Sequence, residues 1–235
     1  KITAMIPVKE FSDDQYVVFI TEKGMVKRIQ LSNLQTARKA GVRAIGLPED
    51  DKLVSVRLTD GDTNIIIATH DGNAIRFHES EIRVMGREAY GVRGIRLKGD
   101  DYVCGAARER EGAYLLTVTE NGYGKMTAVA EYTAHHRGRR GVTAHNLNDK
   151  TGKLVAIKCV TFDEDLLMIT SEGVVIRIGC ETIRVCGRAS QGVILIRLGE
   201  GVKVISIART AKEDEPSQDM ADGATDEQPA ENEEN

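Results

Sequence analysis

The segment Gly91-Val-Arg-Gly-Ile-Arg-Leu97 occurs in four versions along this chain of 235 residues. The leading glycines are 50, 50 and 51 residues apart, and a fixed period of this size indicates repeated supersecondary units. Each version alternates apolar and variable residues, as short strands do, and its glycine suggests positive φ or a close backbone approach. A glycine that serves core packing is the alternative. The other versions are Gly41-Val-Arg-Ala-Ile-Gly-Leu47, Gly141-Val-Thr-Ala-His-Asn-Leu147 and Gly192-Val-Ile-Leu-Ile-Arg-Leu198.

Three further strand-like segments accompany each version of this motif. The second of them is continuously apolar, as in Asn64-Ile-Ile-Ile-Ala-Thr69, and such runs suit a strand buried on both faces. A threonine and a glycine turn follow, as in Thr69-His-Asp-Gly72, which predicts a hairpin to the third strand. The first strand recurs at residues 1–6, 52–57, 101–106, 153–158 and 203–208, so it has five copies against four of the others.

The predicted fold is all-β: a β-propeller-like pinwheel of about four four-stranded antiparallel blades, because one small sheet cannot bury both faces alone. The surplus copy of the first strand has two explanations. Neighbouring blades of a closed ring could share strands, or the chain could be part of a larger ring. This pinwheel domain is expected at residues 1–210. Its repeats are expected at about 1–51, 52–100, 101–152 and 153–210. Residues 211–235 lack periodicity and are predicted to be a disordered acidic tail.

Charge is distributed unevenly along the chain. Residues 213–235 hold ten acidic residues and no Lys or Arg, so the other 212 residues carry a net charge of +6 beneath an overall charge of -4. A basic body suggests a polyanionic partner, with the tail as a competitor for it. A solvated surface with a solubilising tail is the alternative. No run of 18 apolar residues occurs, so no membrane partner is expected. The chain starts without Met inside a strand-like run, which suggests a fragment.

No catalytic or metal-binding constellation is present in the sequence. The four cysteines form no CxxC pair, and Gly122-Tyr-Gly-Lys125 lacks the spacing of a phosphate-binding loop. We therefore expect no metal, no cofactor and no catalytic residue in this chain.

Basic residues recur at fixed places in the repeat and are the candidate DNA-binding residues. Radially arranged units would turn such positions into arcs of positive charge, which suit the regular phosphates of duplex DNA. The loop before the motif has one arginine per unit: Arg38, Arg87, Arg137 and Arg188, with Arg139 and Arg140 beside the third. The third strand has Arg28, Arg76 and Arg177, preceded by Lys27 and Lys125 in two units. The motif itself has Arg43 and Arg93, and Arg96 and Arg197 also match.

Three segments resemble the C-terminal domain of the DNA gyrase A subunit. They are Asn121-Gly-Tyr-Gly-Lys-Met-Thr-Ala-Val-Ala-Glu-Tyr132, Met85-Gly-Arg-Glu-Ala-Tyr-Gly-Val-Arg-Gly-Ile-Arg-Leu97 and Val185-Cys-Gly-Arg-Ala-Ser-Gln-Gly-Val-Ile-Leu-Ile-Arg197. The resemblance covers about residues 1–210 and extends to the acidic tail. It implies a β-pinwheel whose blades exchange strands and whose basic rim wraps double-stranded DNA without sequence specificity.

The resemblance also implies a setting. The domain would support ATP-dependent negative supercoiling by an A2B2 holoenzyme in the bacterial cytoplasm, associated with the nucleoid. Its partners would be the gyrase A N-terminal domain and the gyrase B subunit, with ATP and Mg bound elsewhere in the assembly. The family's strand-cleaving tyrosine lies outside this domain, and no tyrosine here matches it. The resemblance implies that the parent protein is an isomerase, an ATP-dependent DNA topoisomerase, although we expect no catalytic residue in this chain.

The sequence departs from the family in two ways. The glycine- and arginine-rich box of the family's first blade does not occur, and the four repeats are fewer than the usual six blades. We expect the first part of the domain to lie outside this chain. The related C-terminal domain of the topoisomerase IV C subunit, which lacks the box, is an alternative. A propeller scaffold that binds proteins is the alternative from another class, although aromatic residues are few.

Overall fold

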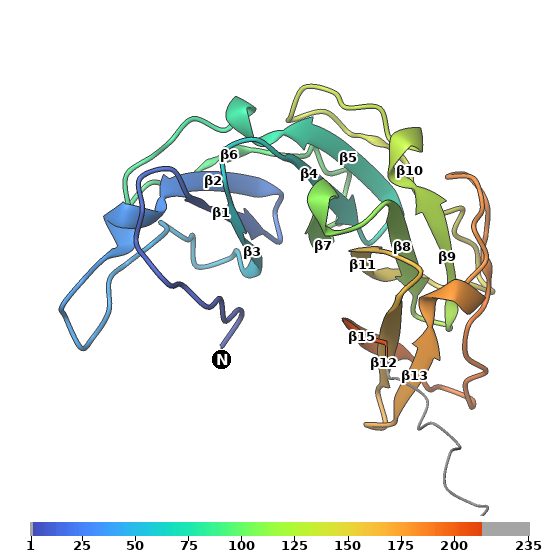
Figure 1. Ribbon diagram of the computed structural model, residues 1–235. Helices are drawn as coiled ribbons and strands as arrows, with labels where there is room; N and C mark the ends of the chain where they lie inside the picture. The colour runs from blue at the N-terminus through green and yellow to red at the C-terminus, as the bar shows by residue number, and fades with distance from the viewer. Residues whose placement is uncertain (1, 213–235) are drawn as a thin grey trace, which may run out of the picture.

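The computed structural model describes residues 2–212. They form an open arc of four small antiparallel sheets, here called blades 1 to 4 in chain order (Figure 1). This confirms the all-β, propeller-like prediction. Residues 213–235, where most of the predicted disordered tail falls, lie outside the described residues, whereas Ala211 is the last residue of a strand.

Three blades have four strands and the fourth has three, among the described residues. Blade 1 contains β1 (Tyr16–Thr21), β2 (Met25–Gln30), β3 (Leu53–Thr59) and β6 (Val92–Arg93). Blade 2 contains β4 (Asn64–Thr69), β5 (Asn73–His78), β7 (Val103–Arg108) and β10 (Val142–Thr143). Blade 3 contains β8 (Tyr114–Thr119), β9 (Tyr123–Ala128), β11 (Leu154–Val160) and β14 (Val193–Ile194). Blade 4 contains β12 (Glu164–Thr170), β13 (Val175–Gly179) and β15 (Val204–Ala211).

Short 3-10 helices follow the strands near the ends of the hairpins. They are η1 (Leu31–Leu34), η2 (Glu79–Glu81), η3 (Glu109–Glu111), η4 (Val129–Glu131) and η5 (Cys180–Thr182). No helix among residues 2–212 is long and apolar enough to cross a membrane.

The predicted first strand closes the preceding blade rather than opening the next one. β3 pairs with β1, and β7, β11 and β15 pair with β4, β8 and β12 in the same way. These four strands line the concave side of the arc (Figure 1). The repeats expected at 1–51, 52–100, 101–152 and 153–210 therefore cut across the sheets, because alternation alone does not show which neighbour a strand pairs with. Residues 2–6, expected to be a first strand, are not in a strand.

The central strands are buried on both faces, as their apolar runs predict. Ile65 and Ile67 of β4 pack between blades 1 and 2, whereas Ile66 and Ala68 pack between blades 2 and 3. All four side chains are completely buried. Because successive side chains of a strand point to opposite faces, one strand contributes to two interblade cores.

The repeated glycine motif supplies the outer strand of the preceding blade. β6 pairs with β2, β10 with β5 and β14 with β9, so each motif crosses back by one blade. This confirms the strand exchange that the family resemblance implied. Residues 41–47 have no preceding blade among the described residues and form no strand.

Close approach explains why the motif begins with glycine. Gly91, Gly141 and Gly192 have φ of 98°, 78° and 77°. A Cβ at these positions would lie 2.5, 2.2 and 2.6 Å from carbonyl oxygens of Val26, Ala74 and Gly124. Both the turn and the approach predicted from the sequence are therefore present. Gly41 has φ of 74°, but a Cβ there would meet nothing within 4 Å.

Gly41 and Gly141 allow the energetic cost of positive φ to be separated from the cost of a clash with the neighbouring strand. We expect Gly141→Ala to lower the free energy of unfolding by about 3 kcal/mol or more, because it adds a clash with Ala74 O to the strain of positive φ. Gly41→Ala adds the strain alone and should cost about 1–2 kcal/mol. Urea denaturation of both variants measures the difference. Equal costs would contradict a docking role for the glycine.

Candidate nucleic-acid interface

The crossing loops lie next to one another on the outer side of the arc. They span residues 36–47, 86–97, 136–147 and 187–198, and together we call them the rim strip. Backbone hydrogen bonds join consecutive loops: Gly46 N donates to Ala89 O at 3.0 Å, Arg96 N to Arg139 O at 2.8 Å, and Asn146 N to Ser190 O at 3.1 Å. The loops thus form one continuous band over four blades (Figure 1).

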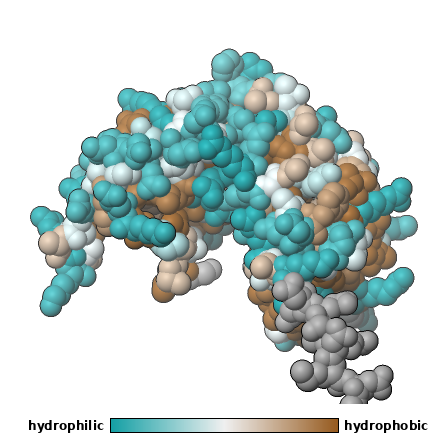
Figure 2. Space-filling model, in the orientation of Figure 1, coloured by the Kyte–Doolittle hydropathy of each residue, from teal (hydrophilic) through white to brown (hydrophobic). Residues whose placement is uncertain are grey.

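Eight of the predicted DNA-binding arginines are exposed on the rim strip. Their side chains make no hydrogen bond or ion pair with any residue in the described range 2–212, so their guanidinium groups face solvent. They are Arg38, Arg43, Arg87, Arg93, Arg96, Arg139, Arg140 and Arg197. Hydrophilic residues also predominate over the top of the arc in Figure 2, whereas hydrophobic residues are visible on its right flank. The rim strip therefore combines a curved backbone with unpaired cations.

The other two arginines of the loop position hold neighbouring loops together. Arg137 donates from Nη1 to Arg93 O at 3.0 Å and from Nε to Glu81 O at 2.9 Å. Arg188 donates from Nη1 to Thr143 O at 2.9 Å, which is the matching contact one blade later. Both side chains are half-buried. The sequence predicted the same role for all four loop arginines. In the structure, Arg137 and Arg188 instead donate hydrogen bonds to the backbone of the neighbouring loop.

Lys27 and Lys125 require a correction, because the sequence placed them among the surface cations. Both are completely buried. The Lys27 ammonium donates to Ala44 O at 2.7 Å and Arg87 O at 2.6 Å, and Lys125 donates to Gly187 O at 2.7 Å and Arg188 O at 2.5 Å. Each lysine thus fixes the loops of the rim strip from below, where no phosphate can reach it.

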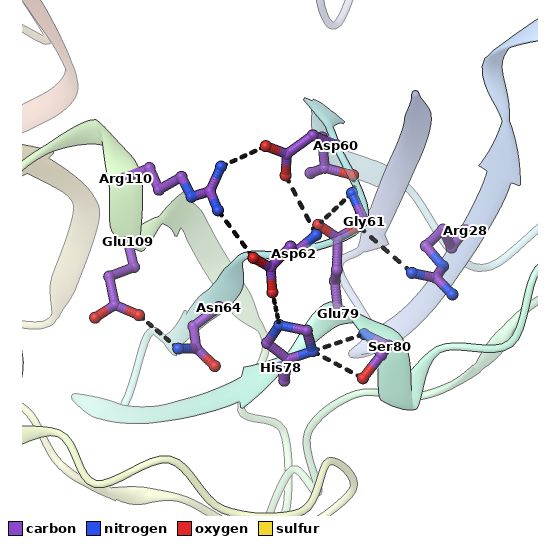
Figure 3. A network of polar contacts seen from close by, with 11 residues as sticks. Arg28, Asp60, Gly61, Asp62, Asn64, His78, Glu79, Ser80, Glu109 and Arg110 are labelled. Carbon is purple, nitrogen blue, oxygen red and sulfur yellow. Dashed lines mark hydrogen bonds and ion pairs between the residues drawn. The ribbon is translucent and has the colours of Figure 1, made fainter. Parts of the chain in front are cut away.

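The third-strand arginines also require a correction, because each of them forms an ion pair with a carboxylate of the protein. Buried Glu79 lies 3.7 Å from Arg28 (Figure 3) and accepts a hydrogen bond from Thr59 Oγ1 at 2.5 Å. Arg28 also lies over the Tyr16 ring. Two further ion pairs of this kind are Arg76 with Glu109 at 2.5 Å and Arg177 with Asp165 at 2.7 Å. The Arg28–Glu79 pair crosses the boundary between blades 1 and 2, and Arg76 also donates to Tyr132 O at 2.9 Å in the segment that follows β9 of blade 3. These guanidinium groups are already paired with carboxylates, and two of the acids, Glu79 and Asp165, are buried, so we do not assign these arginines to DNA.

Two exposed arginines were missed in the sequence analysis. Each lies two residues after the end of the 3-10 helix that follows the third strand, which is η2 for the first and η5 for the second. Arg83 and Arg184 are both exposed. The matching tripeptides Ile82-Arg-Val84 and Ile183-Arg-Val185 recur two repeats apart, which was the available signal. The intervening unit has Thr133 at this position.

The buried titratable groups do not suit catalysis. Burial raises the pKa of Cys159 to about 12 and that of Cys180 to about 11, so neither thiol is an activated nucleophile. Burial lowers the pKa of His145 to about 4, and its ring is held between Thr117 Oγ1 and Gln191 O. Within residues 2–212 there is no cluster of three or more His, Cys, Asp or Glu that could hold a metal ion.

The buried lysines predict a specific pH dependence. Burial lowers the pKa of Lys27 and Lys125 to about 8, whereas an unfolded lysine titrates near 10.5. Between these pH values the unfolded chain binds more protons than the folded one, so the free energy of unfolding contributed by these groups rises with pH. Lys27→Met with Lys125→Met should remove this rise. Each change also leaves two carbonyl oxygens without a donor, at a cost of about 1–3 kcal/mol per site.

Urea denaturation at several pH values from 7.5 to 10 measures both effects. Lys98→Met with Lys150→Met is the matched control, because both of these lysines are exposed. The control should keep the stability and the slope of the wild type. A double variant at Lys27 and Lys125 with an unchanged slope would contradict the assignment.

The geometry agrees with comparisons to known proteins. The family model for the DNA gyrase C-terminal domain, a β-propeller, matches residues 15–60, 63–108, 113–161 and 164–211, which coincide with the inner three strands of each blade. The DNA gyrase A subunit of Staphylococcus epidermidis is 44% identical over 217 residues, covering 91% of this chain and 24% of that protein. The corresponding protein of Staphylococcus aureus is 42% identical over 229 residues, covering 95% and 26%. The chain spans about a quarter of the length of these relatives.

Solved structures show the same architecture. A DNA gyrase A C-terminal domain superposes with a TM-score of 0.77 and 27% identity, covering 86% of this chain and 68% of that one. A DNA topoisomerase IV C-terminal domain gives 0.82 and 28%, covering 88% and 65%. The repeats, the exchanged strands and the family match lead to one assignment: the chain belongs to the DNA gyrase C-terminal domain family of β-propellers.

Proposed function

We propose that the rim strip binds double-stranded DNA through its phosphates and bends the duplex along the arc. The observation that carries the proposal is the continuity of the rim strip, whose loops are hydrogen-bonded from blade to blade and bear solvent-facing arginines. Guanidinium groups form strong charge-assisted hydrogen bonds with phosphate oxygens. Contacts of this kind position a duplex without reading its sequence.

The curvature of the rim strip is the reason to propose wrapping as well as binding. The loops that carry the arginines lie on the convex side of the arc, so a duplex that contacts all four loops must bend around it (Figure 1). Bending stiff DNA costs free energy, which further phosphate contacts along the curve offset. Lys27, Lys125, Arg137 and Arg188 support this by fixing the loops before DNA arrives.

The relatives suggest that this activity serves a larger enzyme. We propose that the chain is the DNA-wrapping part of a gyrase A protein and supports ATP-dependent negative supercoiling by an A2B2 holoenzyme in the bacterial cytoplasm. The gyrase A N-terminal domain would cut DNA, and the gyrase B protein would hold ATP and Mg. Identity of 42–44% to gyrase A proteins supports this assignment. The TM-score of 0.82 to a topoisomerase IV domain makes that enzyme the second candidate.

Salt dependence tests the interface. Each phosphate contact contributes about -0.9 to the slope of log affinity against log salt. The triple variant Arg93→Gln, Arg139→Gln, Arg140→Gln should therefore reduce the magnitude of the slope by about 3, with weaker binding to any duplex sequence. Fluorescence anisotropy with two unrelated duplexes at several salt concentrations measures both quantities.

The matched control removes three positive charges elsewhere: Lys52→Gln, Lys153→Gln and Lys203→Gln. These lysines pair with Glu22, Asp71 and Glu120 near the hairpin ends. The control should keep the wild-type slope. Equal loss in both variants would mean that net charge alone attracts DNA. No DNA binding by the wild type at low salt would instead favour a protein-binding scaffold.

A further inference from the structure

A cavity of about 330 Å³ lies on the concave side of the arc, away from the rim strip. The innermost strands β3, β7, β11 and β15 enclose it, and Thr3 and Ala4 close it on one side. Positions facing it are small in all four blades: Ser55, Gly105, Ala156 and Ser206. This cavity is far too small for a duplex, so the proposed DNA-binding function does not use it.

Two cationic side chains, Arg57 and Lys158, line this cavity from different blades. Arg57 donates to Ala106 O at 2.7 Å and lies 3.6 Å from Glu111 Oε1. Lys158, by contrast, makes no hydrogen bond or ion pair with any residue between 2 and 212. The Lys158 side chain is half-buried, so its ammonium group is accessible to a small ligand that enters the cavity.

Cations outnumber carboxylates around these two side chains. Arg108 pairs with the same Glu111 at 3.0 Å, and Arg209 lies 3.2 Å from Glu164. With Arg57 and Lys158, four cations thus meet two carboxylates. Burial, followed by the nearby charge of Arg57, lowers the pKa of Lys158, whereas Glu111 opposes this effect. The local excess of positive charge would be relieved by an anion in the cavity.

A hydroxyl group in the cavity lining also lacks a partner. Ser55 is 6% exposed, and its Oγ has no hydrogen-bond partner within the described part of the chain. It belongs to the same strand face as Arg57, two residues away, and Ser206 and Thr3 contribute further hydroxyls to the lining. Buried polar atoms are nearly always hydrogen-bonded, so the unpartnered Ser55 Oγ, together with the unpartnered Nε of Arg57, indicates a ligand position.

We propose that this axial cavity binds a small oxyanion of the phosphate class. The Lys158 ammonium and the Ser55 hydroxyl donate to it directly, and Arg57 adds positive potential. Because the ligands come from blades 1 and 3, the bound anion connects parts of the arc that are distant in sequence. It therefore stabilises the curvature of the array from inside, independently of the rim strip.

Thermal unfolding of the full chain in sodium phosphate, against sodium chloride of equal ionic strength, tests the proposal. At tenfold excess over Kd, linkage predicts a rise in Tm of roughly 3–6 °C. Lys158→Met and Ser55→Ala should each reduce the rise by more than half, whereas Lys150→Met, which removes an exposed charge, should keep it. No phosphate-specific rise in the wild type, or an equal rise in Lys158→Met, would overturn the proposal.

Amide chemical shifts of the wild-type protein provide a test that does not depend on folding of the variants. Inorganic phosphate should shift the amides of Gly105 and Ala106, which line the cavity, without shifting those of Arg93 and Arg139. A short duplex should do the reverse. Phosphate shifts confined to the rim strip, or cavity shifts caused by the duplex, would contradict an oxyanion site that is separate from the DNA surface.

Discussion

Each of the first three blades is completed by a two-residue strand from the next blade, and this strand can dock only because a glycine lies against a carbonyl oxygen of its host. Any Cβ at Gly91, Gly141 or Gly192 would lie within 2.6 Å of that oxygen. The same residue turns the chain with positive φ, which only glycine adopts readily. Blades are thereby linked in a fixed order, and the crossing loops must lie side by side on the outer surface.

The positions of the cations follow from this exchange. Carbonyl oxygens of the crossing loops need donors once the loops have docked, and Lys27 and Lys125 supply them from the strand beneath. Arg137 and Arg188 do the same between neighbouring loops. The remaining arginines of the rim strip make no such contact with residues 2–212 and are exposed to solvent. A loop that is already held in place loses little backbone entropy when its arginines bind a phosphate, which is the physical basis of the proposed DNA surface.

The two sides of the arc serve different purposes. On the convex side, cations are separated by solvent and suit an extended polyanion. On the concave side, the four innermost strands bring Arg57, Arg108, Lys158 and Arg209 together in a small space with Glu111 and Glu164. Charges gathered in this way in a site of low dielectric repel one another more strongly than on the rim, so a small anion there is the natural counterpart.

The repeat, the all-β class, the hairpins and the glycine that begins each motif could all be predicted from the amino-acid sequence. The period of 50 residues, the alternation of side chains and the Thr-to-Gly turns are local features, and so are the exposed arginines of the loops. The sharing of strands between blades could not be predicted in this way, since residues 52–57 fit equally well as the end of one unit or the start of the next. The folded chain alone reveals that Lys27 and Arg28 are covered by a loop and a carboxylate from the next blade. The burial of a charged side chain depends on partners that are distant in sequence. A repeat pattern shows where a cation occurs along the chain, but it does not show which residues cover that cation in the fold.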